Sequence, residues 1–169
     1  MAEAFVAIMM GSESDLPVMR ASMDVLEQFS IRYEVRITSA HRTPKDTQDF
    51  VRDAELRGCK VFVAAAGMAA HLAGAVAAQT VKPVIGVPID AGSLQGIDAL
   101  LSTVQMPGGI PVACVAIGKA GAKNAAYLAA QVMAVEDETL AAKLSAERAD
   151  NATKIRASNL AVNQNLESQ

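Results

Sequence analysis

A chain of 169 residues is long enough for one domain with a sizeable core and too short for two ordinary ones, so we expect residues 1–169 to form a single domain. The formal net charge is -3, with acidic and basic residues mixed along the sequence, which excludes the basic stripe of a nucleic-acid-binding protein. No run reaches the roughly 18 apolar residues of a membrane span, and no signal-peptide pattern is present, so we expect a cytoplasmic protein that contacts neither nucleic acid nor membrane.

The first half of the chain alternates between strand and helix patterns. Residues 5–10 are continuously apolar, which predicts a strand buried on both faces of a parallel sheet. Apolar residues at helical spacing predict a helix over about 16–29. Residues 33–38 alternate strictly, which indicates a strand with one wetter face near a sheet edge. A charged helix is expected over 44–57, with proline in its first turn and Thr43 as its cap.

The second half repeats this alternation with shorter and more alanine-rich segments. Strands are expected at 61–65, 84–87 and 112–117. Helices are expected at about 69–80, 93–104, 120–135 and 138–165.

Five strand-helix repeats predict an α/β fold with three layers, in which helices cover both faces of a five-stranded parallel sheet. We expect the flavodoxin-like strand order 2-1-3-4-5. The last helix, 138–165, has no strand after it and a weak apolar face, so we expect it either to pack on a neighbouring subunit or to fray. Because 51% of the residues are apolar and monomers seldom expose large apolar patches, we also expect a homo-oligomer.

Three polar runs follow predicted strands, at the edge where open α/β sheets place their binding crevice. In the first, Gly11 precedes Ser12, Ser14 and Asp15. A glycine turn with hydroxyls at a helix start offers N–H groups and a positive dipole end to a phosphate. The alternative is a plain cap, in which the serines satisfy the first turn. The run is neither GxGxxG nor a P-loop, which favours a small phosphorylated metabolite.

The second run places Ser39, His41 and Arg42 at the end of a strand and before a helix. An imidazole there could take and return a proton near neutral pH. The guanidinium beside it could clamp a phosphate or carboxylate. The alternative is that His41 fills a loop and Arg42 is solvated, but the two neighbouring candidate loops favour the functional interpretation.

The third run contains Gly67, His71 and Leu72, and a packing role for His71 is as plausible as a ligand role. With two histidines in the chain and no CxxC spacing, the ligand count argues against a zinc or iron site. Cys59 and Cys114 lie among apolar residues, so we expect buried free thiols.

Five motifs, in order and at similar spacing, together resemble the N5-carboxyaminoimidazole ribonucleotide mutases of purine biosynthesis. They are Met10–Asp15, Ser39–Pro44, Ala69–Leu72, Val104–Val112 and Ala116–Ala126.

The resemblance implies an isomerase without cofactor or metal. It would move a carboxylate from the exocyclic amine of an imidazole ribonucleotide to the adjacent ring carbon. It implies a flavodoxin-like subunit in a homo-octamer, with His41 as the proton shuttle and Ser12, Asp15 and Arg42 at the ribose phosphate end. The residues implied to bind substrate are Ser12, Ser14, Asp15, Ser39, Arg42, Gly67, His71 and Leu72.

A related branch carboxylates the unsubstituted ribonucleotide with free carbon dioxide, but it has lysine in place of Arg42 and no counterpart of His71. Two residues depart from the mutase pattern, since Met68 replaces a glycine and Ala73 replaces a proline. We expect these changes to reshape the carbon dioxide pocket, with slower turnover or a modified substrate.

A function from another class remains open, namely a phosphate-ligand binding module that keeps the crevice but does no chemistry. Such a module should tolerate His41→Asn, whereas the enzyme should lose nearly all turnover. A flavin-binding electron carrier is disfavoured, because aromatic residues are only 4% of the chain.

Overall fold

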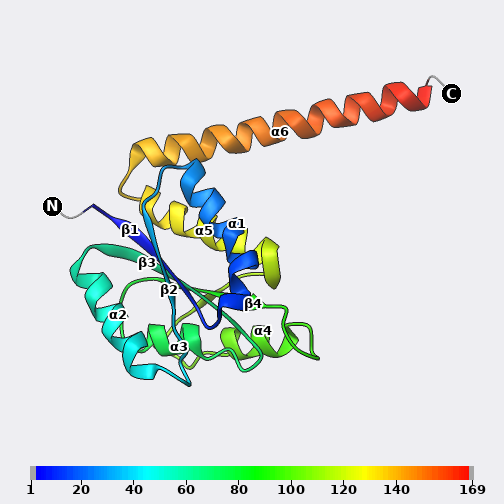
Figure 1. Cartoon of the computed structure of the whole chain (residues 1–169). Coiled ribbons are helices and arrows are strands. Elements are labelled where there is room, and N and C mark those ends of the chain that lie inside the picture. Colours follow the sequence, from blue (N-terminus) through cyan, green and yellow to red (C-terminus); the bar gives the residue numbers. More distant parts are fainter. Residues whose placement is uncertain (1–2, 168–169) are drawn as a thin grey trace. The chain divides into compact units, whose positions relative to one another are not determined.

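The structure, a computed structural model, describes residues 3–167. Its centre is one parallel sheet with the strand order β2-β1-β3-β4-β5, as the sequence predicts (Figure 1). The strands are β1 (Phe5–Met10), β2 (Tyr33–Ile37), β3 (Cys59–Gly67), β4 (Val84–Ile89) and β5 (Ala113–Cys114).

Within residues 3–167, a short 3-10 turn and six α-helices connect and follow these strands. They are η1 (Glu13–Asp15), α1 (Leu16–Gln28), α2 (Pro44–Leu56), α3 (Leu72–Ala77), α4 (Ile97–Val104), α5 (Gly118–Ala134) and α6 (Glu138–Glu167). The chain divides into two units, the first ending at Val132 and the second beginning at Met133. The second unit contains the whole of α6, a continuous helix of 30 residues.

In the first unit, helices cover both faces of the sheet, which gives the three layers that the strand-helix alternation predicts. Helices α1 and α5 lie side by side on one face, where the Ser22 hydroxyl donates to the carbonyl oxygen of Ala122 at 2.5 Å. Helices α2, α3 and α4 lie on the other face (Figure 1).

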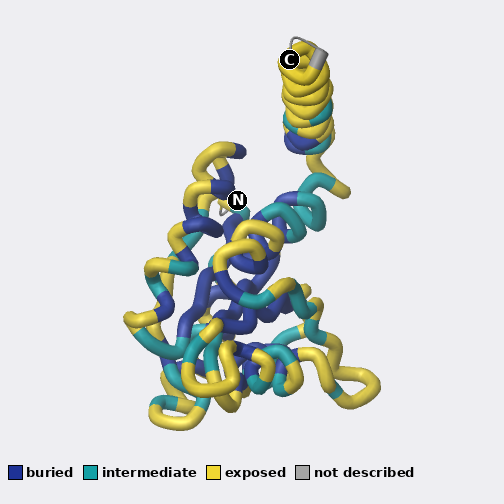
Figure 2. Tube along the Cα trace, turned by 90° about the vertical axis from the view of Figure 1, so that its right-hand side faces the viewer, coloured by how far each residue is buried: buried dark blue, intermediate teal, exposed yellow. Residues whose placement is uncertain are grey.

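The core is centred on β1, whose six residues are all fully buried. Figure 2 shows the buried segments gathered in the interior of the first unit. On the α2 and α3 face, Met9 and Phe62 of neighbouring strands pack with Val51 of α2 and Val76 of α3. Burial of each such side chain stabilises the fold by about 1.5–3 kcal/mol. This packing fixes where the strands end, and therefore where the loops that follow them lie.

Several elements are shorter than the sequence predicts. Helix α4 starts at Ile97 rather than at residue 93, because Gln95 and Gly96 have positive φ angles of 50° and 85°. Helix α3 starts at Leu72 rather than at residue 69, since the chain first makes a left-handed turn at Met68, and it ends at Ala77. Strand β5 is limited to two residues, between Pro111 and the start of α5.

Two expectations about burial are only partly met. Strand β2 is an edge strand as predicted, but its apolar residues Val35 and Ile37 are 43% and 50% exposed. Both cysteines are free, yet only Cys59 is buried, whereas Cys114 lies on the short edge strand β5 and is half-buried. Within residues 3–167, no helix combines the length and apolar character needed to cross a membrane.

Candidate functional site

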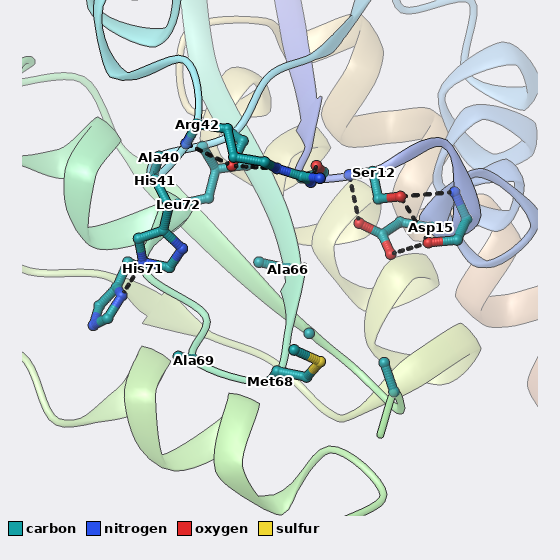
Figure 3. Close-up of a pocket in the computed structure, with 15 residues that line it drawn as sticks. Ser12, Asp15, Ala40, His41, Arg42, Ala66, Met68, Ala69, His71 and Leu72 are labelled. Carbon is teal, nitrogen blue, oxygen red and sulfur yellow. Dashed lines mark hydrogen bonds between the residues drawn. The ribbon is translucent and has the colours of Figure 1, made fainter. Parts of the chain in front are cut away.

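A pocket of about 510 Å³ opens at the carboxyl end of the sheet (Figure 3). Its walls come from the loops that follow β1, β2, β3 and β4, around the point between β1 and β3 where the strand order reverses. All nine residues that the sequence singles out for a substrate line this pocket. They are Ser12, Ser14, Asp15, Ser39, His41, Arg42, Gly67, His71 and Leu72.

The loop after β1 is closed by a capping box. The backbone N–H of Ser14 donates to Oγ of Ser12 at 3.3 Å, and the backbone N–H of Ser12 donates to Oδ2 of Asp15 at 3.1 Å. The predicted serine cap is therefore present, and it places the same side chains on the pocket wall. Asp15 is only 5% exposed, and this burial raises the pKa of its carboxyl despite the hydrogen bonds that it accepts.

Hydrogen bonds made by Thr43 hold the loop after β2. Its Oγ1 accepts the backbone N–H of Ser39 at 3.0 Å and lies 3.2 Å from Oγ1 of Thr38, while its own N–H donates to the carbonyl oxygen of Ser39 at 2.9 Å. Thr43 is the residue before α2, as predicted, but its side chain makes no capping bond to that helix. It fixes instead the short loop that carries His41 and Arg42.

Arg42 links the loops after β1 and β2. Its Nη2 donates to the carbonyl oxygen of Gly11 at 3.3 Å, and its Nε donates to Oγ of Ser39 at 3.4 Å. Figure 3 shows the side chain extended across the pocket toward Ser12. The guanidinium is exposed and retains further N–H donors, so it can bind an anion in the pocket.

The loop after β3 is shaped by close packing. A side chain at Gly67 would place its Cβ 2.8 Å from Cβ of Ala91, so this glycine allows the loop after β4 to approach. Met68 follows with a φ of 53°, a conformation that costs a residue with a Cβ about 1–2 kcal/mol. Its side chain is 58% exposed and lines the pocket, and a Cβ added at Gly92 would lie 3.4 Å from its Cγ.

The two histidines meet at one end of the pocket. His71 immediately precedes α3, and Nε2 of His41 lies 2.5 Å from Nδ1 of His71. Leu72, the first residue of α3, is 2% exposed, so its side chain packs in the core at the same time as it closes the pocket. The sequence left a packing or a ligand role open for His71, and the structure places its ring at the pocket and exposed.

Sequence reasoning missed the contribution of the loop after β4. Ala91 lines the pocket, and the available signal was its position directly after β4, the strand next to β3. A small apolar residue carries no chemical pattern of its own. The alanines at 40, 66 and 69 were also not singled out as pocket residues for this reason.

The pocket combines a guanidinium, three serine hydroxyls, a buried carboxyl and two imidazoles. A cation beside hydroxyl groups suits a phosphate, and an imidazole suits proton transfer near neutral pH. In the described part of the chain, no group of three histidine, cysteine, aspartate or glutamate residues is arranged to hold a metal ion.

Comparison with known proteins identifies the family. Residues 5–154 match the family model described as AIR carboxylase. This chain belongs to the AIR carboxylase family. The match covers every strand of the sheet and every loop that lines the pocket.

Curated members of the AIR carboxylase family share about half of their residues with this chain. The protein of Vibrio parahaemolyticus named N5-carboxyaminoimidazole ribonucleotide mutase is 52% identical to this chain, over 85% of this chain and 89% of that protein. The one from Bacillus subtilis is 51% identical, over 88% and 91%, and the one from Brucella melitensis is 55% identical, over 82% and 86%.

A solved structure of the same family has the same fold. The crystal structure of Treponema denticola PurE superposes with a TM-score of 0.83 at 31% sequence identity, over 92% of this chain and 96% of that chain.

Proposed function

We propose that this chain is an N5-carboxyaminoimidazole ribonucleotide mutase, an isomerase of purine biosynthesis. Identities of 51–55% to relatives of that name support this activity. The observation that carries the proposal is the placement of His41 and Arg42 in one pocket with Ser12 and Asp15. That pocket joins an anion-binding group to a proton-transferring one.

The site residues divide into two groups in this proposal. Arg42, with Ser12 and Asp15, holds the ribose phosphate end of the substrate, because the guanidinium already lies against the Ser12 loop. Ser14 and Ser39 supply further hydroxyl contacts from the same two loops. Gly67, His71 and Leu72 form the opposite wall of the pocket, where the ring of His71 contacts His41.

His41 is the proton shuttle. In the first step its imidazolium gives a proton to the exocyclic amine nitrogen, the bond between nitrogen and carboxylate carbon breaks, and carbon dioxide leaves. In the second step the ring carbon attacks this carbon dioxide, and His41 removes the proton displaced from that carbon. One imidazole balances both steps, since the proton that it gives is replaced by the proton that it takes.

Confinement makes the second step efficient, because a trapped carbon dioxide molecule has a high effective concentration beside the nucleophilic carbon. The wall formed by Gly67, Met68 and Leu72 is where such a molecule is held in this proposal. Met68 stands where the mutase pattern has a glycine, so we propose that it narrows this part of the pocket and slows turnover.

We further propose that the chain assembles as a cytoplasmic homo-octamer in which residues 1–169 form one catalytic domain. Leu94, Ile97, Leu101 and Val104 give α4 and the turn before it an apolar stripe, each residue 48–60% exposed. Monomers rarely leave such a stripe uncovered. Residues 138–165 of α6, which expose Ile155 at 72%, pack on a neighbouring subunit in this assembly.

The deciding experiment is turnover of freshly prepared N5-carboxyaminoimidazole ribonucleotide by the metal-free chain, with His41→Asn beside it. We expect the ring-carboxylated isomer from the wild-type chain. The variant should lose roughly 10²- to 10⁴-fold in turnover, the range for loss of general acid-base catalysis, and keep most of its affinity.

Two other outcomes would contradict the proposal. Turnover only with the unsubstituted ribonucleotide and carbon dioxide would assign the carboxylase reaction instead. Binding without isomerisation, unchanged in His41→Asn, would assign a binding module. Static light scattering gives the subunit number, and a monomer would contradict the octamer.

A further inference from the structure

The two histidines of the chain form a direct pair. Nε2 of His41 and Nδ1 of His71 are 2.5 Å apart, and the rings meet edge to face with centroids separated by 4.8 Å and planes at 86° (Figure 3). Two ring nitrogens at hydrogen-bond distance must share one proton, because two lone pairs or two N–H groups would repel each other. Within residues 3–167, the structure records no other polar side-chain contact for either ring.

The recorded contacts of residues 3–167 give the side chain of His71 no role in holding the fold together. It precedes α3, but it makes no capping hydrogen bond, and the residue is exposed. Its backbone is well fixed, since its N–H donates to the carbonyl oxygen of Ala69 and its own carbonyl oxygen accepts from Ala75, both at 2.9 Å. The buried side chain of Leu72 anchors the next residue. The fold therefore fixes the His71 backbone, and within residues 3–167 the recorded polar contact of its ring is the one with His41.

The backbone of His41 is equally well fixed, but its ring is not. Hydrogen bonds between Ser39 and Thr43 close the loop around it. The imidazole itself is exposed, and an exposed ring can occupy several rotamers and either neutral tautomer. In the part of the chain that the structure describes, the recorded interaction that selects among them is the contact with His71.

We infer that His71 is a positioning residue for His41: it holds Nε2 of His41 and leaves Nδ1 to exchange the proton with the substrate. This inference rests on the proposed mutase function. In this arrangement Nε2–H of His41 donates to the lone pair of Nδ1 of His71, because an imidazolium that gives a proton from Nδ1 carries N–H groups on both ring nitrogens. His71 takes no proton from the substrate and acts only through the ring that it orients.

Three substitutions at one position separate positioning from substrate contact. His71→Asn keeps a polar atom near the place of Nδ1, His71→Gln moves it toward the place of Nε2, and His71→Leu removes it. We expect kcat to fall roughly 10- to 100-fold in the Gln and Leu variants, the range seen when the hydrogen-bond partner that orients a metal-binding histidine is lost. KM should stay within about twofold, and His71→Asn should recover most of kcat.

Other results would overturn the inference. A rise in KM at constant kcat in all three variants would make His71 a substrate contact. Unchanged kinetics in His71→Leu, or equal losses of kcat in His71→Asn and His71→Gln, would show that the hydrogen bond between the two rings does not support catalysis. Circular dichroism and thermal melts exclude misfolded variants from this comparison.

Nitrogen-15 NMR of the imidazole rings tests the pair without substrate. The chain has two histidines, so His71→Asn leaves one ring and assigns both sets of signals. We expect one dominant neutral tautomer of His41 in the wild-type chain and a mixture in His71→Leu; a mixture in both would overturn the inference. Absence of mutase turnover in the wild-type chain would instead reject the proposed function, which this ring measurement does not depend on.

Discussion

At the amino end of the sheet, Glu34 of β2 lies between two guanidinium groups, 2.5 Å from Nη2 of Arg32 and 2.5 Å from Nη1 of Arg57. Both arginines also stack over the ring of Phe5, at 4.7 Å and 5.2 Å from its centroid. At the carboxyl end, the carboxyl of Asp15 is nearly buried, and its recorded partners within residues 3–167 are N–H and hydroxyl groups rather than a cation.

The pKa values of these two carboxyl groups move in opposite directions. The hydrogen bond from Arg57 lowers the pKa of Glu34, whereas burial raises the pKa of Asp15. The amino end pairs its charges, while the carboxyl end keeps a buried carboxyl whose recorded partners in residues 3–167 are uncharged, a left-handed Met68 and two exposed imidazoles. Groups that stabilise the fold poorly persist where they have another use, and this contrast marks the carboxyl end as the functional one.

The sharpest way to break this contrast is to remove one arginine from each end. Arg42→Ala at the carboxyl end should raise KM about 10- to 100-fold, because it removes charged hydrogen bonds to the substrate. Its unfolding free energy should change by no more than about 0.5 kcal/mol. Arg52→Ala, an exposed arginine on α2 outside the pocket, is the matched control for steady-state kinetics. Equal KM values in the two variants would contradict the assignment of Arg42.

Arg57→Ala at the amino end should show the reverse pattern. It removes the contacts of Arg57 with Glu34 and Asp53 and its stacking on Phe5. Because Arg57 is partly exposed, we expect a loss of only about 0.5–1 kcal/mol of unfolding free energy in urea titrations. kcat and KM should be unchanged, and a kinetic effect as large as that of Arg42→Ala would erase the difference between the two ends.

Met68 and Ser30 provide a second comparison, since both have positive φ angles, 53° and 58°, but only Met68 lines the pocket. Glycine at either position relieves backbone strain at some cost in unfolded-state entropy, so each variant should gain about 0.5–1 kcal/mol. Turnover should rise in Met68→Gly and stay constant in Ser30→Gly. Thermal melts and progress curves on the same samples check both statements, and parallel kinetics would show that Met68 has no influence on the pocket.

The smallest expected effect is on the free energy of unfolding at acid pH. The pKa of Glu34 lies below its ordinary value of 4.5, so the unfolded chain binds this proton more tightly, and stability falls as the pH drops through that lowered pKa. For Asp15 the sign is opposite. Its pKa lies above its ordinary value of 3.8, so its contribution to stability is lost as the pH rises from that value through the raised pKa. Urea midpoints of Glu34→Gln and Asp15→Asn from about pH 7 to about pH 3 separate the two slopes. If the stability of Glu34→Gln falls more steeply toward low pH than that of the wild-type chain, the sign predicted for Glu34 is wrong.

The strand order and the pocket wall were predictable because both depend on local patterns. Continuous apolar runs identify buried parallel strands, and polar residues directly after them must lie at the carboxyl edge. The lengths of α3 and α4 were not predictable, because they depend on left-handed turns at Met68, Gln95 and Gly96, and two of these residues are not glycine.

The pairing of His41 with His71 was equally hidden. The two residues are 30 positions apart, and only the placement of β2 and β3 on either side of β1 brings their loops together. Ala91 was missed because its role is to be small beside Gly67, a property that has meaning only once the packing is known.

The two edges of the sheet bear on how copies of this chain can associate. Strand β5 has two residues, so a strand added there would gain few ladder hydrogen bonds, and β2 carries the charged side chains of Glu34 and Arg36. Short and charged edges both resist edge-to-edge growth and the aggregation that follows from it. A closed assembly joined through helical surfaces is consequently compatible with this sheet, whereas a continuous sheet running from one subunit to the next is not favoured.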